Sequence, residues 1–159
     1  KAEDDEFWQT HYSEGVYVGY RWYATKEIPV QFPFGHGLSY TTFEYSNAKA
    51  AKSSMKADGK LKVTVDVANT GDVDGAEIVQ LYIADPESSI DRPAKELKGF
   101  EKVWLKAGQK KTVTFEIDAE DLSYFDAEKH AWVAEPGEFQ ALLGSSSEDL
   151  KAMVSFQLK

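Results

Sequence analysis

Residues 60–71 read KLKVTVDVANTG, and this stretch decides the fold class because apolar and polar residues alternate along it. In an extended strand, successive side chains point to opposite faces. One face of this segment is therefore polar, and its other face carries Leu61, Val63, Val65 and Val67. A strand that is apolar on one side only is typical of an antiparallel sheet with one solvated face.

The same alternation recurs towards the C-terminus, and turn-forming sequences such as ADGK, NTGDVDG, KAGQKK and EPGE separate the segments. The inward side chains that it predicts are Val79, Leu81, Ile83, Val113, Phe115, Ile117, Phe139, Ala141, Leu143, Val154, Phe156 and Leu158. We expect about seven strands, near 41–48, 60–69, 76–84, 96–105, 110–118, 138–144 and 151–158, with a short hairpin in LSYFDAEKHAWVAE. The predicted fold is all-β, an antiparallel β-sandwich of the immunoglobulin or fibronectin type III-like kind.

The first 38 residues do not continue this rhythm. The stretch EGVYVGYRWYATKE is rich in Tyr, Trp and Gly, and no helix of convincing length is expected in it or elsewhere. We therefore predict an irregular N-terminal arm or linker over residues 1–38 and a sandwich domain over residues 39–159.

Composition excludes several classes of partner. The chain has 159 residues and a formal net charge of -9, whereas nucleic acids and anionic membranes bind clustered Lys and Arg. No apolar run is long enough to span a bilayer. The acidic N-terminus has neither a signal peptide nor an initiator Met, which suggests a processed chain or an excised fragment. Secreted, periplasmic and cytoplasmic locations all remain open.

Catalytic and metal-binding signals are weak. His36 lies between two glycines and could approach a ligand, but no Ser or Asp lies at a catalytic spacing, which favours a turn residue. The DVDGAE stretch at 72–77 lacks the later Glu of a calcium loop. The absence of Cys excludes thiolate sites. We assign no catalytic residue, no cofactor and no metal ligand.

The connection around residues 85–96 is long, and long loops are often functional. Arg92 in this loop could reach a partner surface, although a solvated position is the more ordinary expectation. Trp104 and Trp132 would suit a sugar-binding face if they were exposed, but core packing is the more common role.

Two long motifs, YSEGVYVGYRWY at 12–23 and FPFGHGLSYTTFEYS at 32–46, resemble the C-terminal region of glycoside hydrolase family 3 enzymes, the β-glucosidases and related β-xylosidases. Residues 63–117, LSYFD at 122–126 and PGEFQALLGSSSEDL at 136–150 are similar to the fibronectin type III-like domain of that family. The resemblance extends from about Tyr12 to Leu158.

The resemblance implies that a barrel domain and an α/β domain carry the catalytic carboxylates, and that the fibronectin-like domain comes last and does no chemistry. No S-D-W nucleophile motif occurs in this sequence. The implied partners are the catalytic domains of a larger β-glucosidase, and a β-glucoside would be bound only through them. A carbohydrate-binding module and an interaction or homodimerisation module remain the alternatives.

The stretch around Pro33 would then be the crossing from the α/β domain into the sandwich, with aromatic side chains filling the joint. The long loop at 85–96 would shape the rim of the active site without taking part in the chemistry.

 The residues that we expect at this interface between domains are Tyr20, Arg21, Trp22, Phe32, Phe34, His36, Tyr40 and Arg92.

Overall fold

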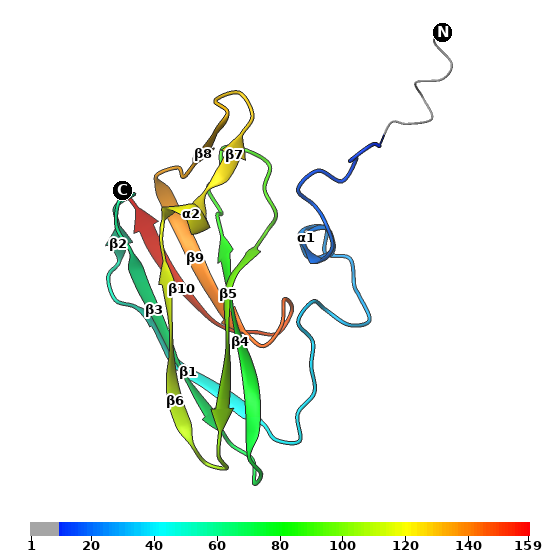
Figure 1. Ribbon diagram of the computed structural model, residues 1–159, viewed down its shortest axis with the longest axis vertical. Coiled ribbons are helices and arrows are strands. Elements are labelled where there is room, and N and C mark those ends of the chain that lie inside the picture. The colour runs from blue at the N-terminus through cyan, green and yellow to red at the C-terminus, as the bar shows by residue number, and fades with distance from the viewer. Residues whose placement is uncertain (1–9) are drawn as a thin grey trace.

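Residues 43–158 form two β-sheets packed face to face, and residues 10–42 run beside them (Figure 1). The structure is a computed structural model that describes residues 10–159; the first nine residues of the predicted arm lie outside the described part. The smaller sheet is antiparallel, with the order β1-β3-β6. Its strands are β1 (Phe43–Ala50), β3 (Leu61–Asn69) and β6 (Lys110–Ile117).

The larger sheet has five strands in the order β2-β10-β9-β4-β5. They are β2 (Ser54–Met55), β4 (Gly75–Ala84), β5 (Glu96–Leu105), β9 (Gly137–Gly144) and β10 (Leu150–Leu158). The predicted all-β sandwich is confirmed, with two corrections. Strand β2 was not predicted, because two residues are too short to show an alternating pattern, and it pairs with β10 in parallel, not antiparallel, orientation.

A hairpin of β7 (Tyr124–Asp126) and β8 (Ala131–Val133) forms within the stretch where the sequence predicts one. Two short helices, α1 (Tyr20–Thr25) and α2 (Ala119–Leu122), were not predicted. Helices of six and four residues leave almost no periodic signal in a sequence. No helix within residues 10–159 has the length and apolar character needed to cross a membrane.

The core lies between the two sheets and is built from the alternating side chains. The four inward residues of β3 are at most 1% exposed. Phe139 of β9 and Phe156 of β10 stack with their ring centroids 6.0 Å apart. Burying a side chain of this size contributes about 1.5–3 kcal/mol. Val154 is the exception among the predicted inward residues, because it stays partly exposed.

Asn69 is the last residue of β3 and holds the turn that follows it. It is 1% exposed, and its Nδ2 donates to the carbonyl oxygens of Val73 at 2.8 Å and Leu105 at 3.2 Å. Its Oδ1 accepts hydrogen bonds from the Thr41 hydroxyl at 2.6 Å and the Gly71 N–H at 3.1 Å. The NTG sequence is therefore a turn whose buried amide is fully satisfied.

The outer face of β4 departs from the predicted pattern. Gln80, Tyr82 and Ala84 point away from the core, yet they are only 4%, 0% and 8% exposed. The prediction that each strand is buried on one face only is therefore wrong for the second half of β4. Residues from the first 38 of the chain cover this face.

Candidate functional site

Helix α1 anchors the N-terminal arm, by which we mean residues 10–38 of the described structure, to the outer face of the larger sheet. The ring of Tyr20 stacks on Phe34 at 4.8 Å and meets the buried Tyr82 edge-on at 5.9 Å. Its hydroxyl accepts a hydrogen bond of 2.7 Å from the backbone N–H of Leu97 in β5. Tyr20 thus joins α1 to two strands of the sandwich.

Gly35 brings the arm into close contact with β4 and explains the glycine before His36. Its φ is 81°, and a Cβ at this position would lie 2.4 Å from Nε2 of Gln80. That Nε2 donates to the carbonyl oxygens of Gly35 at 3.4 Å and Ser145 at 2.7 Å. Only glycine has both the backbone freedom and the space that this approach requires.

His36 follows this contact and is exposed. Its imidazole lies 5.3 Å from the ring of Phe32, and its backbone N–H donates to the carbonyl of Pro33 at 3.0 Å. Gly37, by contrast, has nothing within 4 Å of where a Cβ would lie. The structure therefore places His36 in a local turn beside an aromatic ring.

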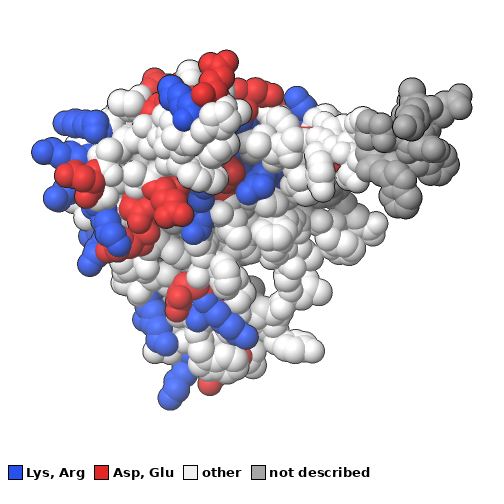
Figure 2. Space-filling view, turned by 45° about the horizontal axis from the view of Figure 1, so that its top comes forward, with Lys and Arg blue, Asp and Glu red and all other residues white. Residues whose placement is uncertain are grey.

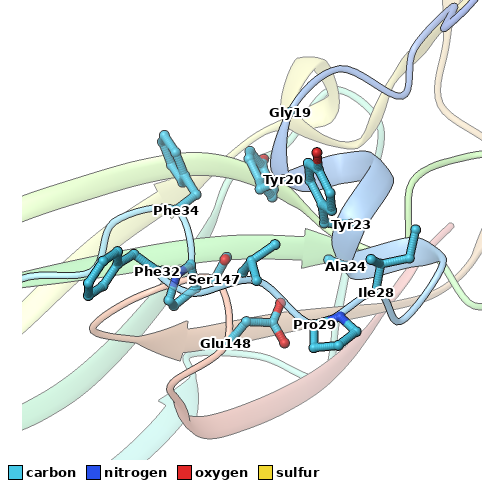
Figure 3. Close-up of a pocket in the computed structure, with 12 residues that line it drawn as sticks. Gly19, Tyr20, Tyr23, Ala24, Ile28, Pro29, Phe32, Phe34, Ser147 and Glu148 are labelled. Atoms are coloured by element: carbon cyan, nitrogen blue, oxygen red, sulfur yellow. The ribbon is translucent and has the colours of Figure 1, made fainter.

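A cavity of about 450 Å³ lies between the arm and the loop that joins β9 to β10. Figure 3 shows Tyr20 and Tyr23 projecting from α1, Phe32 and Phe34 on the segment that follows, and Glu148 on the β9–β10 loop. Glu148 is its one carboxylate, and it pairs with Lys95 at 3.3 Å. The lining residues are Gly19, Tyr20, Tyr23, Ala24, Ile28, Pro29, Val30, Phe32, Pro33, Phe34, Ser147 and Glu148.

Among the predicted interface residues, Arg92 is buried by contacts within this chain. Its side chain is 8% exposed, so the expectation of a solvated position is wrong. Nη1 contacts Asp85 at 3.1 Å and donates to the Leu122 carbonyl at 3.0 Å, while Nη2 contacts Glu96 at 3.0 Å. The guanidinium also lies 5.7 Å from the ring of Tyr124. Arg92 therefore ties the 85–96 loop to the base of the β7–β8 hairpin, inside this chain.

In this cluster, burial changes the pKa of Asp85 more than the attraction to Arg92 does. The pKa of the Asp85 carboxyl is raised by desolvation, although the Arg92 guanidinium acts in the opposite direction. A buried ion pair of this kind holds a geometry more than it adds stability, since both charges lose their hydration.

The arm binds the end of the same loop at three further points. The Tyr17 hydroxyl donates to the carbonyl of Arg92 at 3.3 Å, and the Thr25 hydroxyl accepts from the N–H of Ala94 at 2.9 Å. Arg21 contacts Glu96 at 3.4 Å, so one carboxylate holds both Arg21 and Arg92. Interaction with the Asp91 carboxylate raises the pKa of Tyr17 to about 12. The arm and the 85–96 loop are thus joined into one surface.

Most of the uncovered apolar surface belongs to the arm and the linker after it. Of the twenty large apolar side chains found exposed in the described residues, eleven lie between Tyr12 and Tyr40. Phe32 is 67% exposed and Tyr40 is fully exposed. Trp22 is 41% exposed and packs edge-on against Tyr17 at 6.1 Å. In Figure 2 the charged side chains gather away from the arm, and the surface near it is mostly uncharged.

Several carboxylates of the described residues take part in local structure. Glu135 accepts hydrogen bonds from the hydroxyls of Ser89 and Tyr124, and Asp74 accepts one of 2.9 Å from the N–H of Ala107. Within residues 10–159, no group of three or more potential ligand side chains lies close enough to hold a metal ion. The DVDGAE stretch forms a bend followed by the first three residues of β4, with Gly75 packed against Thr41.

The structure brings Tyr20, Arg21, Phe32 and Phe34 together around α1, whereas Tyr40 stands apart. Sequence reasoning missed the partners of these residues, above all Gln80 and Tyr82 beneath the arm and Glu148 at the cavity. One signal for the first two was available. In VQLYIA at 79–84, a Gln and a Tyr occupy positions that would face solvent in a one-sided strand, and neither carries a charge.

Comparison with known proteins finds relatives that match almost the whole chain. The fibronectin type III-like domain family matches residues 77–147. The β-glucosidase BoGH3A of Bacteroides ovatus is 51% identical over 146 residues, which are 92% of this chain and 20% of that protein. The GH3 β-glucosidase of Bifidobacterium adolescentis superposes with a TM-score of 0.86 at 43% identity, covering 91% of this chain and 21% of that one.

The β-glucosidase of Kluyveromyces marxianus, solved in complex with glucose, superposes with a TM-score of 0.85 at 44% identity. The match covers 93% of this chain and 18% of that one. This chain therefore spans about one fifth of the length of the relatives that it matches.

Proposed function

The chain belongs to glycoside hydrolase family 3, where it corresponds to the C-terminal region with the fibronectin type III-like domain, and from this we propose that it stabilises the catalytic domains of a β-glucosidase without doing chemistry itself. The larger enzyme would hydrolyse terminal β-D-glucosides with retention, through a covalent glycosyl-enzyme intermediate. That reaction needs no cofactor.

The observation that carries this proposal is the uncovered aromatic surface of the arm. Apolar patches of this kind on a soluble protein mark surfaces that contact another protein. The cavity between α1 and the β9–β10 loop has mostly apolar walls, which suit a side chain of a partner. The catalytic domains are the natural partner, because the relatives that match this chain are about five times as long.

The use of the carboxylates supports a non-catalytic role. A retaining glycosidase needs two carboxyl groups about 5–5.5 Å apart, on either side of a sugar. The arm cavity contains Glu148 alone, and Asp85, Glu96 and Glu135 hold loops in place. We expect the isolated chain to show no turnover of an aryl β-glucoside. Turnover that disappears when one of its carboxylates is mutated would contradict the proposal.

Docking can be tested with the catalytic region of a relative such as BoGH3A, produced without the part that matches this chain. Adding this chain should raise the melting temperature of that region and increase its activity. Phe34→Ser should weaken the effect strongly, because Phe34 lines the arm cavity. Trp104→Ser is the control, since Phe34 and Trp104 are 49% and 59% exposed and only Phe34 lies on the arm. Equal effects of both variants would contradict docking on the arm.

A second copy of this chain is the competing occupant of the arm surface. Sedimentation of the chain alone distinguishes the two cases. A dimer that Phe34→Ser abolishes would indicate self-association through the arm, whereas a monomer that docks on the catalytic region supports the proposal.

A further inference from the structure

We propose that the outer face of the β7–β8 hairpin, together with the hollow beside it, binds a neutral sugar, and that the sugar is a glucose unit of an oligosaccharide. The site lies outside the arm surface described above. The choice of glucose rests on the proposed function, whereas the site itself rests on the geometry of the hairpin.

Two aromatic side chains form the apolar part of this site. Phe125 and Trp132 are direct partners across the hairpin, and their rings meet edge-on at 5.7 Å. They are 51% and 69% exposed. The neighbouring Tyr124 lies over the guanidinium of Arg92 and donates to Glu135 at 3.2 Å, so the hairpin is fastened by its other residues. The Phe125–Trp132 pair is thus held in place with much of its surface free.

A polar hollow of about 300 Å³ lies beside the indole, lined by Lys98, Asp118, Glu120, Asp121 and Trp132. Asp118 and Asp121 each use one carboxylate oxygen to cap helix α2, which leaves a second oxygen on each. In the described part of the chain, neither the Lys98 ammonium nor the Glu120 carboxylate pairs with another side chain. The hollow therefore offers both donors and acceptors next to an aromatic face.

This combination matches the chemistry of a pyranose ring. Such a ring has a face of C–H groups, which packs on an aromatic ring, and a rim of hydroxyls that each donate and accept hydrogen bonds. Three carboxylates disfavour an anionic ligand, because like charges repel. The Lys98 ammonium offsets part of this negative charge and supplies hydrogen-bond donors for hydroxyl groups. A neutral polyhydroxylated ligand uses every group present.

Trp104 provides a matched comparison within the same chain. It is 59% exposed, close to the value for Trp132, but it lies on β5 and does not line the polar hollow. If exposure alone were enough for an indole to bind sugar, Trp104 and Trp132 would bind it equally well.

The test is titration of the 159-residue chain with cellotetraose and laminaritetraose, followed by calorimetry and by the indole N–H signals in NMR spectra. We expect saturable binding with a Kd of about 1 mM or tighter, and a shift of the Trp132 signal without one of Trp104. Trp132→Ala should abolish binding and Trp104→Ala should leave it unchanged. Glu120→Gln, which keeps the aromatic pair intact, should weaken binding by about threefold or more. Melting curves establish that each variant is folded.

Saturation that survives Trp132→Ala, or no saturable binding by a folded chain, would overturn the proposal. Displacement of the sugar by an arginine ester would show that the hollow is a cation site and would overturn it as well. Binding of xylotetraose in place of the glucose oligomers would refute the choice of glucose. A chain that docks on the catalytic region but binds no sugar would remove this site and leave the proposed function intact.

Discussion

The sandwich buries its inward apolar side chains, whereas the arm leaves many of its apolar side chains exposed. In β3 of the sandwich the inward side chains are at most 1% exposed, whereas Phe32 and Leu38 of the arm are 67% and 94% exposed. The sandwich has a core of its own. The arm is anchored at separate points, among them the Tyr20 ring, the Gly35 backbone, the Phe34 carbonyl, which accepts from the Ser147 N–H, and polar contacts with the 85–96 loop. A segment of this kind is held in place by its neighbour and presents the rest of its surface to a partner.

The largest effect should come from the core. Phe139→Ala should lower the free energy of unfolding by about 3–5 kcal/mol, because it removes a ring that is buried between the sheets. Phe32→Ala in the arm should change it by less than about 0.5 kcal/mol. Urea denaturation of the two variants measures the difference. Similar losses would mean that the arm shares one cooperative core with the sandwich.

Arg92, which is buried beneath the loop that the arm contacts, should give the next largest effect. Arg92→Ala leaves the Asp85 carboxylate buried without its cation and should cost about 3 kcal/mol at neutral pH. Arg21→Ala, which removes a longer and more exposed contact with Glu96, should cost less than about 1 kcal/mol.

The pH dependence identifies the cause of the Arg92→Ala defect. Burial raises the pKa of Asp85 in the folded state, so the folded state binds its proton more tightly than the unfolded state does. The buried charge of Asp85 therefore destabilises the folded variant at pH values above the pKa of the unfolded state. This loss of stability disappears as acid protonates Asp85. The defect should shrink below about pH 5, where melting curves are informative. A defect of constant size across this range would point to lost packing instead.

A smaller and local effect is expected at Gly35. Gly35→Ala forces a side chain into the left-handed region and against Gln80, and should cost about 1–2 kcal/mol. Hydrogen exchange should speed up at the Leu97 amide, which is bonded to Tyr20, while the core amides of β3 stay protected. Gly37→Ala is the control, because it has open space at its Cβ position. Loss of protection throughout the sandwich would contradict a merely local role of the arm contact.

The smallest effect lies on the face of the sandwich that the arm does not touch. Hydrogen bonds from Asn47, Thr112 and Lys110 lower the pKa of the Asp66 carboxyl well below its usual range. A lowered folded pKa gives stability that is present above the unfolded pKa and is lost as the pH falls towards the folded one. The melting temperature should therefore fall less steeply between about pH 4 and pH 2 in Asp66→Asn than in the parent chain. Thr112→Val, which removes one donor, should lie between them; identical slopes would exclude this contribution.

Prediction from sequence succeeded where the signal is local. Alternation of apolar and polar residues places Leu61, Val79 and Phe139 on inward faces without knowledge of any neighbour. It failed at β2 and α1, which are too short to establish a period, and on the outer face of β4. It also misplaced Arg92, because a cation in a long loop gives no sign of the two carboxylates that bury it.

The sequence by itself determined that this chain forms one-sided strands separated by turns, since strand alternation is a property of consecutive residues. Only the tertiary structure decided which outer face is covered and which aromatic side chains remain free. Those outcomes depend on contacts between distant positions, such as Gly35 with Gln80 and Tyr20 with Leu97, which are 45 and 77 residues apart. The physical reason is that a contact of this kind forms only after the sheets have brought its partners together.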